Sequence, residues 1–386
     1  MDTTAEKQKK FSFRAALLSL SLLTIMSGAG VAPGIHTIAE AFPGTPETVI
    51  KLIISLPPLF MIITALLSGM LGQYIKHRIL IGSGLVLFII GGVGAGYMHS
   101  IPYILLFRAI LGFGTGIILP FSTGLIAACY LGDDRSRMMG YSSAANCTGA
   151  VIGNILAGVL AVISWKYMFS IYWLGAFVLL LTVFFLKPLP DAGHETANKE
   201  KLPSGVFLYS FFAFLTMMIF FLIVTNLSFF VDARDLGSSW ITGFLFAANS
   251  LTMLVAGVLL QCMTRLKRYF VPLVLILISA GIFGIAKAPS LSPMFLSVIV
   301  AGFGLGLLFP FLLNSISKNV PKYLSVKAMS VGMASAWLGQ FVSPVVFGGI
   351  AAAYGLSMTS VFFYISVIIL AVAAGYLLFN VINKKR

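Results

Sequence analysis

One charged residue lies deep inside an apolar segment, and its position suggests two kinds of chemistry. Arg108 falls about seven residues into the apolar run 101–130, which at about 1.5 Å per residue places it roughly 10 Å from the end of a helix. A charge at that depth is energetically unfavourable and normally faces a protein interior or a water-filled cavity. Arg108 is therefore either a brace that donates hydrogen bonds to carbonyl groups, or a group that takes part in substrate binding or energy coupling.

The acidic residues and histidines offer one pair with a spacing that suits proton transfer. All eleven Asp and Glu residues fall at the ends of apolar runs or between them. His36 and Glu40 are four residues apart, so they share one face of a helix, and histidine titrates near neutral pH. The pair is either a proton carrier or a wetted interfacial pair. The remaining charges near those ends are interpreted as solvated loop residues: Glu47, Lys51, Asp232, Arg234 and Asp235.

No constellation in the sequence indicates an enzyme, a metal or a cofactor. Catalysis in a membrane would need clustered His, Asp, Glu or Cys residues in a span or a facing loop, and the sequence shows no such cluster. Cys129, Cys147 and Cys262 are isolated in apolar runs and form no CxxC pair. The glycines from Gly112 to Gly116 follow no strand, which argues against a phosphate-binding loop. We expect no enzymatic activity and no cofactor.

The elements that hold these residues follow from the composition. The chain has 386 residues, of which 59% are hydrophobic and 9% are charged, whereas a soluble domain is typically about 45–50% apolar and about 25% charged. A membrane-spanning helix takes about 20 apolar residues. The sequence predicts an all-α polytopic membrane protein with twelve spans, in the runs 13–39, 49–75, 79–98, 101–130, 138–163, 166–186, 205–231, 238–264, 269–287, 291–317, 326–353 and 357–381.

The basic residues predict how these spans are oriented. The net charge is +14, and 20 of the 25 Lys and Arg residues fall in segments that are cytoplasmic if the N-terminus is inside. This placement favours a plasma-membrane protein with both termini in the cytoplasm over a nucleic-acid binder. The longest polar interval lies after the sixth run. It predicts an N-terminal six-helix bundle at 1–186, a cytoplasmic linker at 187–204 and a C-terminal six-helix bundle at 205–386.

An internal repeat relates the two halves. A shift of 190 residues aligns Gly112–Phe121 with Gly302–Phe311, Gly149 with Gly339, and Gly158 with Gly348. With a small gap, Gly69–Gln73 resembles Gly257–Gln261. An even number of helices per half makes such repeats parallel, about an axis along the membrane normal. Glycines at these spacings either allow helices to pack closely or form a smooth surface on which two bundles move.

Three motifs carry a resemblance to a known family. Arg108-x-x-x-Gly112-x-Gly114 resembles the intramembrane R-x-x-x-G-x-G motif of the major facilitator superfamily. The helix predicted at 138–163 resembles the drug/proton antiporter motif G-x8-G-x3-G-P-x-x-G-G, with Asn154 where Pro is expected and Ala157 where Gly is expected. The matching glycines of that helix are Gly140, Gly149, Gly153 and Gly158, and a proline occurs at the repeat-equivalent position Pro344. The segment Gly69–Arg78 resembles the loop motif G-x-L-a-D-R-x-G-R-R, with Gln73 at the acidic position.

The resemblance implies a secondary transporter that works by alternating access, as a monomer in the lipid bilayer. By the antiporter motif it would export small organic or amphipathic molecules in exchange for protons. An organic-anion exchanger or uniporter with Arg108 as the anion anchor is the alternative. His36 and Glu40 are the candidates for proton coupling. The candidates for the translocation path are Arg108, Asn146, Asn226, Asn314 and Gln340. The candidates for conformational motifs are Gly69, Gln73, Arg78, Gly112, Gly140, Gly149, Gly153, Gly158 and Pro344.

Overall fold

The computed structural model describes the chain except for residues 1, 25, 72–74, 187–201, 322–323 and 383–386. The described residues contain no strand, and ten stretches are long and apolar enough to cross a membrane. One of these stretches, Ser239–Lys287, contains two helices, and a shorter apolar helix covers Ser12–Leu23. The described part of the chain therefore holds twelve apolar segments, which confirms the predicted all-α polytopic fold.

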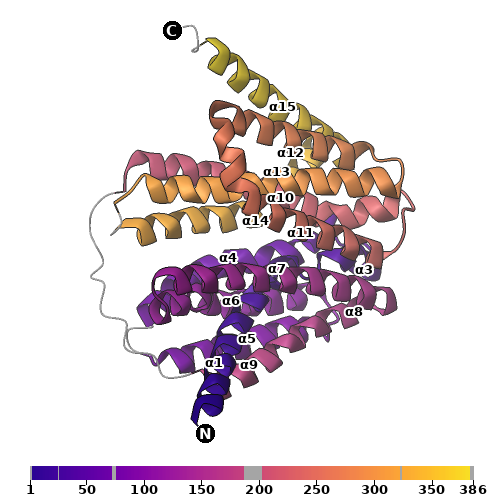
Figure 1. Ribbon diagram of the computed structural model, residues 1–386. Helices are drawn as coiled ribbons and strands as arrows, with labels where there is room; N and C mark the ends of the chain where they lie inside the picture. Colours follow the sequence, from indigo (N-terminus) through magenta and orange to yellow (C-terminus); the bar gives the residue numbers. More distant parts are fainter. Residues whose placement is uncertain (1, 25, 72–74, 187–201, 322–323, 383–386) are drawn as a thin grey trace. The chain divides into compact units, whose positions relative to one another are not determined.

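The chain divides into two compact units, Met1–Lys199 and Glu200–Arg386. The helices of the first unit are α1 (Asp2–Thr24), α2 (Met26–Ala29), η1 (Ala32–Gly34), α3 (Ile35–Ala41), α4 (Glu47–Leu71), α5 (His77–Ala95), α6 (Ile101–Cys129), α7 (Gly132–Ile163), α8 (Trp165–Met168), η2 (Phe169–Trp173) and α9 (Leu174–Phe185). Within this unit α6 packs against α4 and α5, and α1 packs against α7 and α9 (Figure 1).

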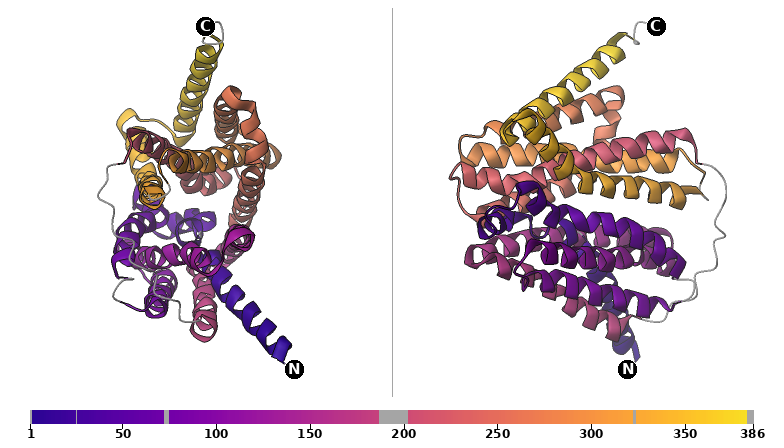
Figure 2. Two further views of the ribbon diagram at one scale, coloured as in Figure 1. Left: turned by 60° about the vertical axis from the view of Figure 1, so that its left-hand side comes forward. Right: turned by 180° about the vertical axis from the view of Figure 1, so that it is seen from behind.

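The second unit contains α10 (Ser204–Ala233), α11 (Ser239–Met263), η3 (Thr264–Tyr269), α12 (Phe270–Lys287), α13 (Leu291–Lys318), α14 (Ser325–Tyr354) and α15 (Met358–Ile382). Here α13 packs against α11 and α12, α10 packs against α14, and α12 packs against α15, as two further views show (Figure 2). The predicted linker 187–204 lies almost wholly outside the described residues.

Two of the predicted spans are not single helices. The run 13–39 contains α1, α2, η1 and α3, and η1 includes Pro33, which has no backbone N–H to donate to the preceding turn. The run 166–186 is built from most of α8, then η2 and α9. These interruptions matter because a broken helix leaves carbonyl oxygens without their usual backbone donors.

Glycines set the helix contacts of both units in the same way. A Cβ atom on Gly112 would lie 2.5 Å from the Pro57 oxygen of α4, and one on Gly302 would lie 2.6 Å from Asn249 Nδ2 of α11. A Cβ on Gly114 would lie 2.5 Å from the Phe88 nitrogen of α5. Only glycine permits such close approach of the helix backbones, so at these positions the packing interpretation holds.

The same contacts correct one detail of the repeat. Within the first unit Gly116 faces Met61 of α4, and within the second unit Gly306 faces Met253 of α11. Met61 and Met253 are 192 residues apart, whereas the resemblance of Gly69–Gln73 to Gly257–Gln261 uses a shift of 188. The sequence alignment of α4 with α11 was therefore wrong by about one helical turn, because short glycine motifs recur at that spacing.

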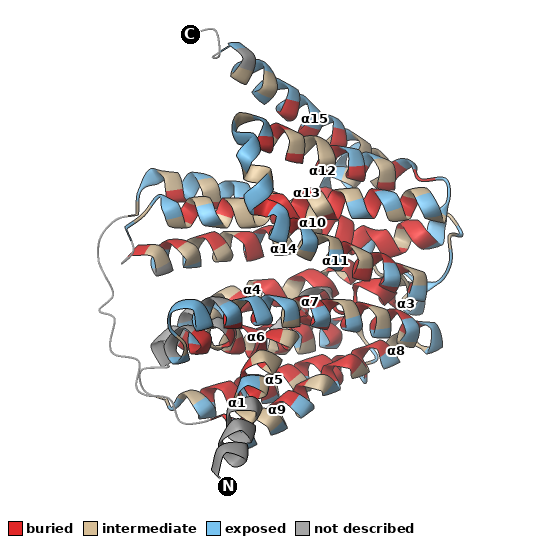
Figure 3. Cartoon of the chain, in the orientation of Figure 1, coloured by how far each residue is buried: buried red, intermediate tan, exposed pale blue. Residues whose placement is uncertain are grey.

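The side chains that face away from neighbouring helices are largely apolar. Figure 3 shows buried positions along the inner faces of each unit and exposed positions along the others. Phe184, Val258 and Leu378 are 73%, 75% and 63% exposed. Extensive exposed apolar surface of this kind is expected of a protein whose solvent is lipid.

Candidate functional site

Arg108 is fully buried inside the first unit, and its guanidinium donates to three oxygens. Nε donates to Ile53 O at 2.6 Å, Nη2 donates to Ser27 O at 2.6 Å, and Nη1 donates to the Tyr172 hydroxyl at 2.7 Å. These acceptors lie on α4, α2 and η2, so a single side chain on α6 connects four segments of the unit. Hydrogen bonds from a charged donor are the strong ones.

A proline explains why Ile53 O is available. In an α-helix this oxygen would accept a hydrogen bond from the backbone nitrogen four residues later. That residue is Pro57, which lies inside α4 and has no N–H. The guanidinium of Arg108 supplies the donor that Pro57 removes.

The end of a helix explains the second acceptor. Ser27 lies in α2, which ends at Ala29, and the last carbonyls of a helix have no intrahelical donor. Nη2 of Arg108 donates to Ser27 O, and the Tyr172 hydroxyl donates to Met26 O at 3.1 Å. A cation at this position also interacts favourably with the negative end of the helix dipole. The Arg108 guanidinium lies 5.5 Å from the centre of the Tyr172 ring.

These contacts match the brace that the sequence left open as one role for Arg108. Among them, the sequence did not predict Pro57, Ser27 or Tyr172 as partners. The Pro57–Pro58 pair was the available signal, because two prolines inside a helix expose carbonyl groups that need donors. A role of Arg108 in substrate binding or coupling stays a prediction.

His36 and Glu40 lie on α3 as expected. His36 Nδ1 and Glu40 Oε2 are 3.9 Å apart, and the two side chains are 20% and 64% exposed. The contact is long for a hydrogen bond but close enough for an ion pair when the imidazole is protonated. The exposed carboxylate can exchange protons with water, so the geometry is compatible with both interpretations of the pair.

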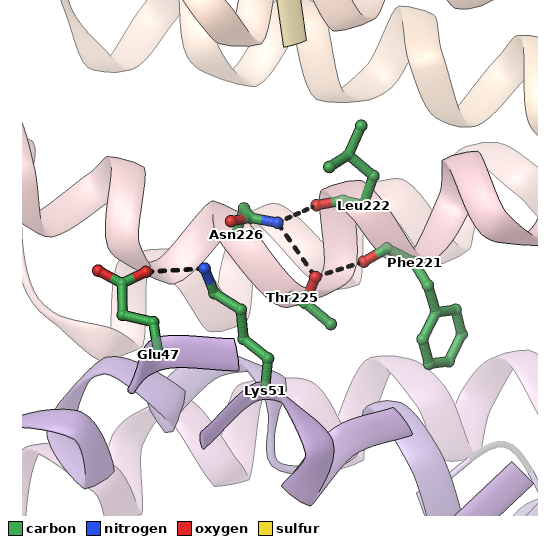
Figure 4. A network of polar contacts seen from close by, with 6 residues as sticks. All are labelled: Glu47, Lys51, Phe221, Leu222, Thr225 and Asn226. Atoms are coloured by element: carbon green, nitrogen blue, oxygen red, sulfur yellow. Dashed lines mark hydrogen bonds and ion pairs between the residues drawn. The ribbon is translucent and has the colours of Figure 1, made fainter. Parts of the chain in front are cut away.

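A second pair with the same spacing lies at the start of α4. Lys51 Nζ contacts Glu47 Oε2 at 2.7 Å, and the Lys51 side chain is only 2% exposed (Figure 4). The expectation that Lys51 is a solvated loop charge was wrong. Four residues into a helix, a lysine side chain faces its neighbours as easily as the solvent, and hydropathy alone does not distinguish these positions.

Arg234 was also predicted to be solvated, and it is not. It follows α10, and its guanidinium donates to Ile285 O at 2.7 Å, to Ala286 O at 2.6 Å and to Ala288 O at 3.1 Å. These oxygens belong to the end of α12, where carbonyl groups lack backbone donors. Partial burial lowers the pKa of Arg234. Arg234 thus joins the ends of α10 and α12 within the second unit.

The polar residues predicted for the translocation path lie on four helices. Asn146 of α7 is half-buried, and Asn314 of α13 is exposed. Gln340 of α14 donates to Met217 Sδ at 3.6 Å. Asn226 of α10 donates through Nδ2 to Leu222 O at 2.8 Å and to Thr225 Oγ1 at 3.1 Å (Figure 4).

The residues of the conformational motifs differ in what surrounds them. A Cβ on Gly153 would lie 2.9 Å from the Met26 side chain, whereas one on Gly140 would have no atom within 4 Å. Gly158 is buried on α7. Pro344 lies inside α14. Gln73 and the surroundings of Gly69 lie outside the described residues.

Arg78, at the other end of the predicted loop motif, donates to Val183 O of α9. Among the described residues, no three His, Cys, Asp or Glu side chains are grouped as metal ligands would be.

Comparison with curated proteins gives transporters. An uncharacterized transporter of Schizosaccharomyces pombe is 27% identical over 153 residues, which are 40% of this chain and 31% of that protein. The multidrug transporter protein MdtP of Bacillus subtilis is 27% identical over 106 residues, or 27% of this chain and 20% of that protein. The quinolone resistance protein NorA of Staphylococcus aureus is 24% identical over 182 residues, or 47% and 46%. The matched segments span less than half the length of each of these relatives.

Solved structures match the fold over nearly the whole chain. A bacterial homologue of the human lysosomal transporter Spinster has a TM-score of 0.74 at 16% identity, covering 95% of this chain and 96% of that chain. A D-xylose–proton symporter has a TM-score of 0.73 at 18% identity, covering 95% and 97%. The Major Facilitator Superfamily profile matches residues 17–324 and 210–386. The chain therefore belongs to the major facilitator superfamily, and it is a membrane transporter of small molecules rather than an enzyme.

Proposed function

We propose that this transporter exports small organic or amphipathic molecules across the plasma membrane in exchange for protons, by alternating access. The observation that supports the mechanism best is the equivalence of the two units. In each, a glycine-bearing central helix, α6 or α13, packs against the equivalents of the same two neighbours through glycines at matching positions. Two bundles of the same construction are the arrangement on which alternating access depends.

The relatives support the substrate class and the direction of transport. MdtP is named a multidrug transporter and NorA a quinolone resistance protein, so we infer that this chain also moves amphipathic organic molecules out of the cell. The large apolar surface of the helices is consistent with such cargo, but the substrate class rests on these two names.

For proton coupling we propose the pair of His36 and Glu40. No Asp or Glu lies at the centre of an apolar run, so a carboxylate for proton transfer must come from the end of a helix. Glu40 is largely exposed, and the imidazole of His36 lies within ion-pair distance of it. A histidine can gain and lose a proton within the working pH range.

The organic-anion alternative receives no specific support from the geometry. An anion bound to Arg108 would have to compete with Ile53 O, Ser27 O and the Tyr172 hydroxyl for the guanidinium protons. We therefore propose Arg108 as a positioning residue that maintains the shape of the first unit.

Proteoliposomes test the proposed transport. Purified protein in liposomes with an acidic lumen should accumulate a fluorescent quinolone beyond protein-free liposomes, and nigericin should abolish the difference by removing the pH gradient. Accumulation that is protein-dependent but independent of the gradient would instead favour an exchanger or a uniporter.

The topology is tested by labelling. We propose that both termini and the linker are cytoplasmic, on the evidence of the basic residues. A cysteine introduced at Ala197 and another at Thr45 should react with an impermeant thiol reagent from opposite sides of the membrane, in a background in which the three native cysteines are replaced by alanine. Reaction of both from outside the cell would contradict the twelve-span assignment.

A further inference from the structure

Four buried polar atoms of the described residues have no hydrogen-bond partner: Ser55 Oγ, Ser210 Oγ, Thr242 Oγ1 and Asn226 Oδ1. Three of them belong to hydroxyl groups, which can rotate to find a partner. Asn226 differs, because its amide oxygen can point in only one direction while the amide nitrogen is held. Buried polar atoms without a partner are rare in folded proteins, and each needs an explanation.

The amide of Asn226 is held in one orientation by its neighbours on α10. Leu222 O is a carbonyl oxygen and can only accept, at 2.8 Å from Asn226 Nδ2. The Thr225 hydroxyl gives its proton to Phe221 O at 2.7 Å, so its oxygen accepts from Asn226 Nδ2 at 3.1 Å. Both amide hydrogens are therefore used, and turning the amide over would place two oxygens against each other. Figure 4 shows these contacts at the nitrogen and none at the oxygen.

The surroundings of this oxygen are apolar and aromatic. Every residue from Phe221 to Ser228 is buried, and Asn226 itself is 2% exposed. One turn further along α10, Phe230 packs edge-on against Phe362 of α15, with ring centres 4.8 Å apart. A neutral amide oxygen beside aromatic rings is suited to a hydrogen-bond donor on an aromatic molecule rather than to a bare charge.

We propose that Asn226 Oδ1 accepts a hydrogen bond from an N–H group of the transported molecule, which is an aromatic, amphipathic compound that carries such a donor. This inference rests on the proposed function, because it assigns a donor group to the substrate of that same transporter. Thr225 acts as a positioning residue, since its oxygen holds the amide so that Oδ1 remains available.

Two dyes that differ only in their donors test the proposal. One is a diaminoacridinium whose ring nitrogen is methylated, and the other is the same dye with both amino groups dimethylated. Both are planar cations, but only the first has N–H donors. In lipid nanodiscs the wild-type protein should bind the first dye about three- to tenfold more tightly by fluorescence polarisation, which is the usual net value of one hydrogen bond. Asn226→Leu should bind both dyes alike.

Stability without ligand gives a second, independent measurement. Because leucine removes an unpartnered buried acceptor, Asn226→Leu should melt at the same or a higher temperature than the wild type. Asn249→Leu is the matched control: Asn249 Nδ2 donates to Val298 O at 3.2 Å, so this variant should melt at a lower temperature and keep the preference for the donor dye. If Asn226→Leu gives too little protein, Asn226→Ala takes its place in the dye comparison.

The outcomes separate this inference from the proposed function. If Asn226→Leu keeps the wild-type preference for the donor dye, or if it melts at a clearly lower temperature, the amide is structural and the inference is overturned. If neither dye binds the wild-type protein, the proposed substrate class is wrong. In that case the melting temperature of Asn226→Leu still decides whether the amide oxygen is needed for the fold.

Discussion

Replacing Pro57 by alanine should make the protein depend less on Arg108, because the two residues act on the same carbonyl oxygen. In the native chain Arg108 Nε donates to Ile53 O at 2.6 Å. Alanine at position 57 would return a backbone N–H to that oxygen. The variant Arg108→Met, which keeps an apolar stem, would then leave two oxygens without a donor rather than three.

The magnitude follows from the three bonds. A hydrogen bond from a charged donor contributes about 1.5–3 kcal/mol, so losing all three lowers the free energy of unfolding by at most about 4–9 kcal/mol. Relief of the buried charge offsets part of this, which leaves about 3–5 kcal/mol for Arg108→Met. About one third belongs to Ile53 O. The double variant should therefore lose about 1–1.5 kcal/mol less than the sum of the single variants.

Unfolding by sodium dodecyl sulfate in mixed micelles, followed by tryptophan fluorescence, measures these free energies. Pro58→Ala is the matched control, because it returns an N–H to Ile54 O, which is not a recorded acceptor of Arg108. Combined with Arg108→Met, it should give additive effects. If Pro57→Ala is also additive with Arg108→Met to within about 0.5 kcal/mol, the proline does not create the acceptor and the reasoning fails.

Three further perturbations address other parts of the molecule. Gly114→Val should abolish monodisperse protein in size-exclusion chromatography because its Cβ would meet the backbone of α5, whereas Gly140→Val, with open space around it, should behave as wild type; equal yields would contradict the packing. Arg234→Gln should lower the free energy of unfolding by about 1–3 kcal/mol in the same detergent titration, since it loses charged donors at the end of α12. Combining His36→Gln with Glu40→Gln should reduce flux driven by a pH gradient more than exchange of labelled for unlabelled substrate, and unchanged values in both assays would exclude the pair from coupling.

Local sequence features predicted the helices and the repeat because the signals are short-range. Apolar runs of about 20 residues mark spans wherever they occur, and the glycines from Gly112 to Gly116 recur 190 residues later with the same helix neighbours. The interruptions at η1 and η2 were not predicted. Hydropathy is averaged over a window, and a break of three to five residues in an apolar run leaves that average unchanged.

The site residues show where sequence analysis stops. The depth of Arg108 was evident from its position in an apolar run, but its acceptors lie 55, 64 and 81 residues away in the chain. Lys51 and Arg234 were taken for solvated charges because each lies near the end of a run. Their burial depends on neighbouring helices, and Arg234 contacts residues more than 50 positions away. Such information is tertiary and is not present in any local window.

The way Arg108 is bound has a consequence for how this region varies during evolution. Two of its three acceptors are main-chain oxygens, which every amino acid supplies, so the side chains at positions 27 and 53 can change without disturbing the contact. Statistical coupling between columns of an alignment would therefore not detect these contacts. Covariation with Arg108 should appear only at Tyr172, which contributes a side-chain atom, and at Pro57, whose missing proton leaves an oxygen free.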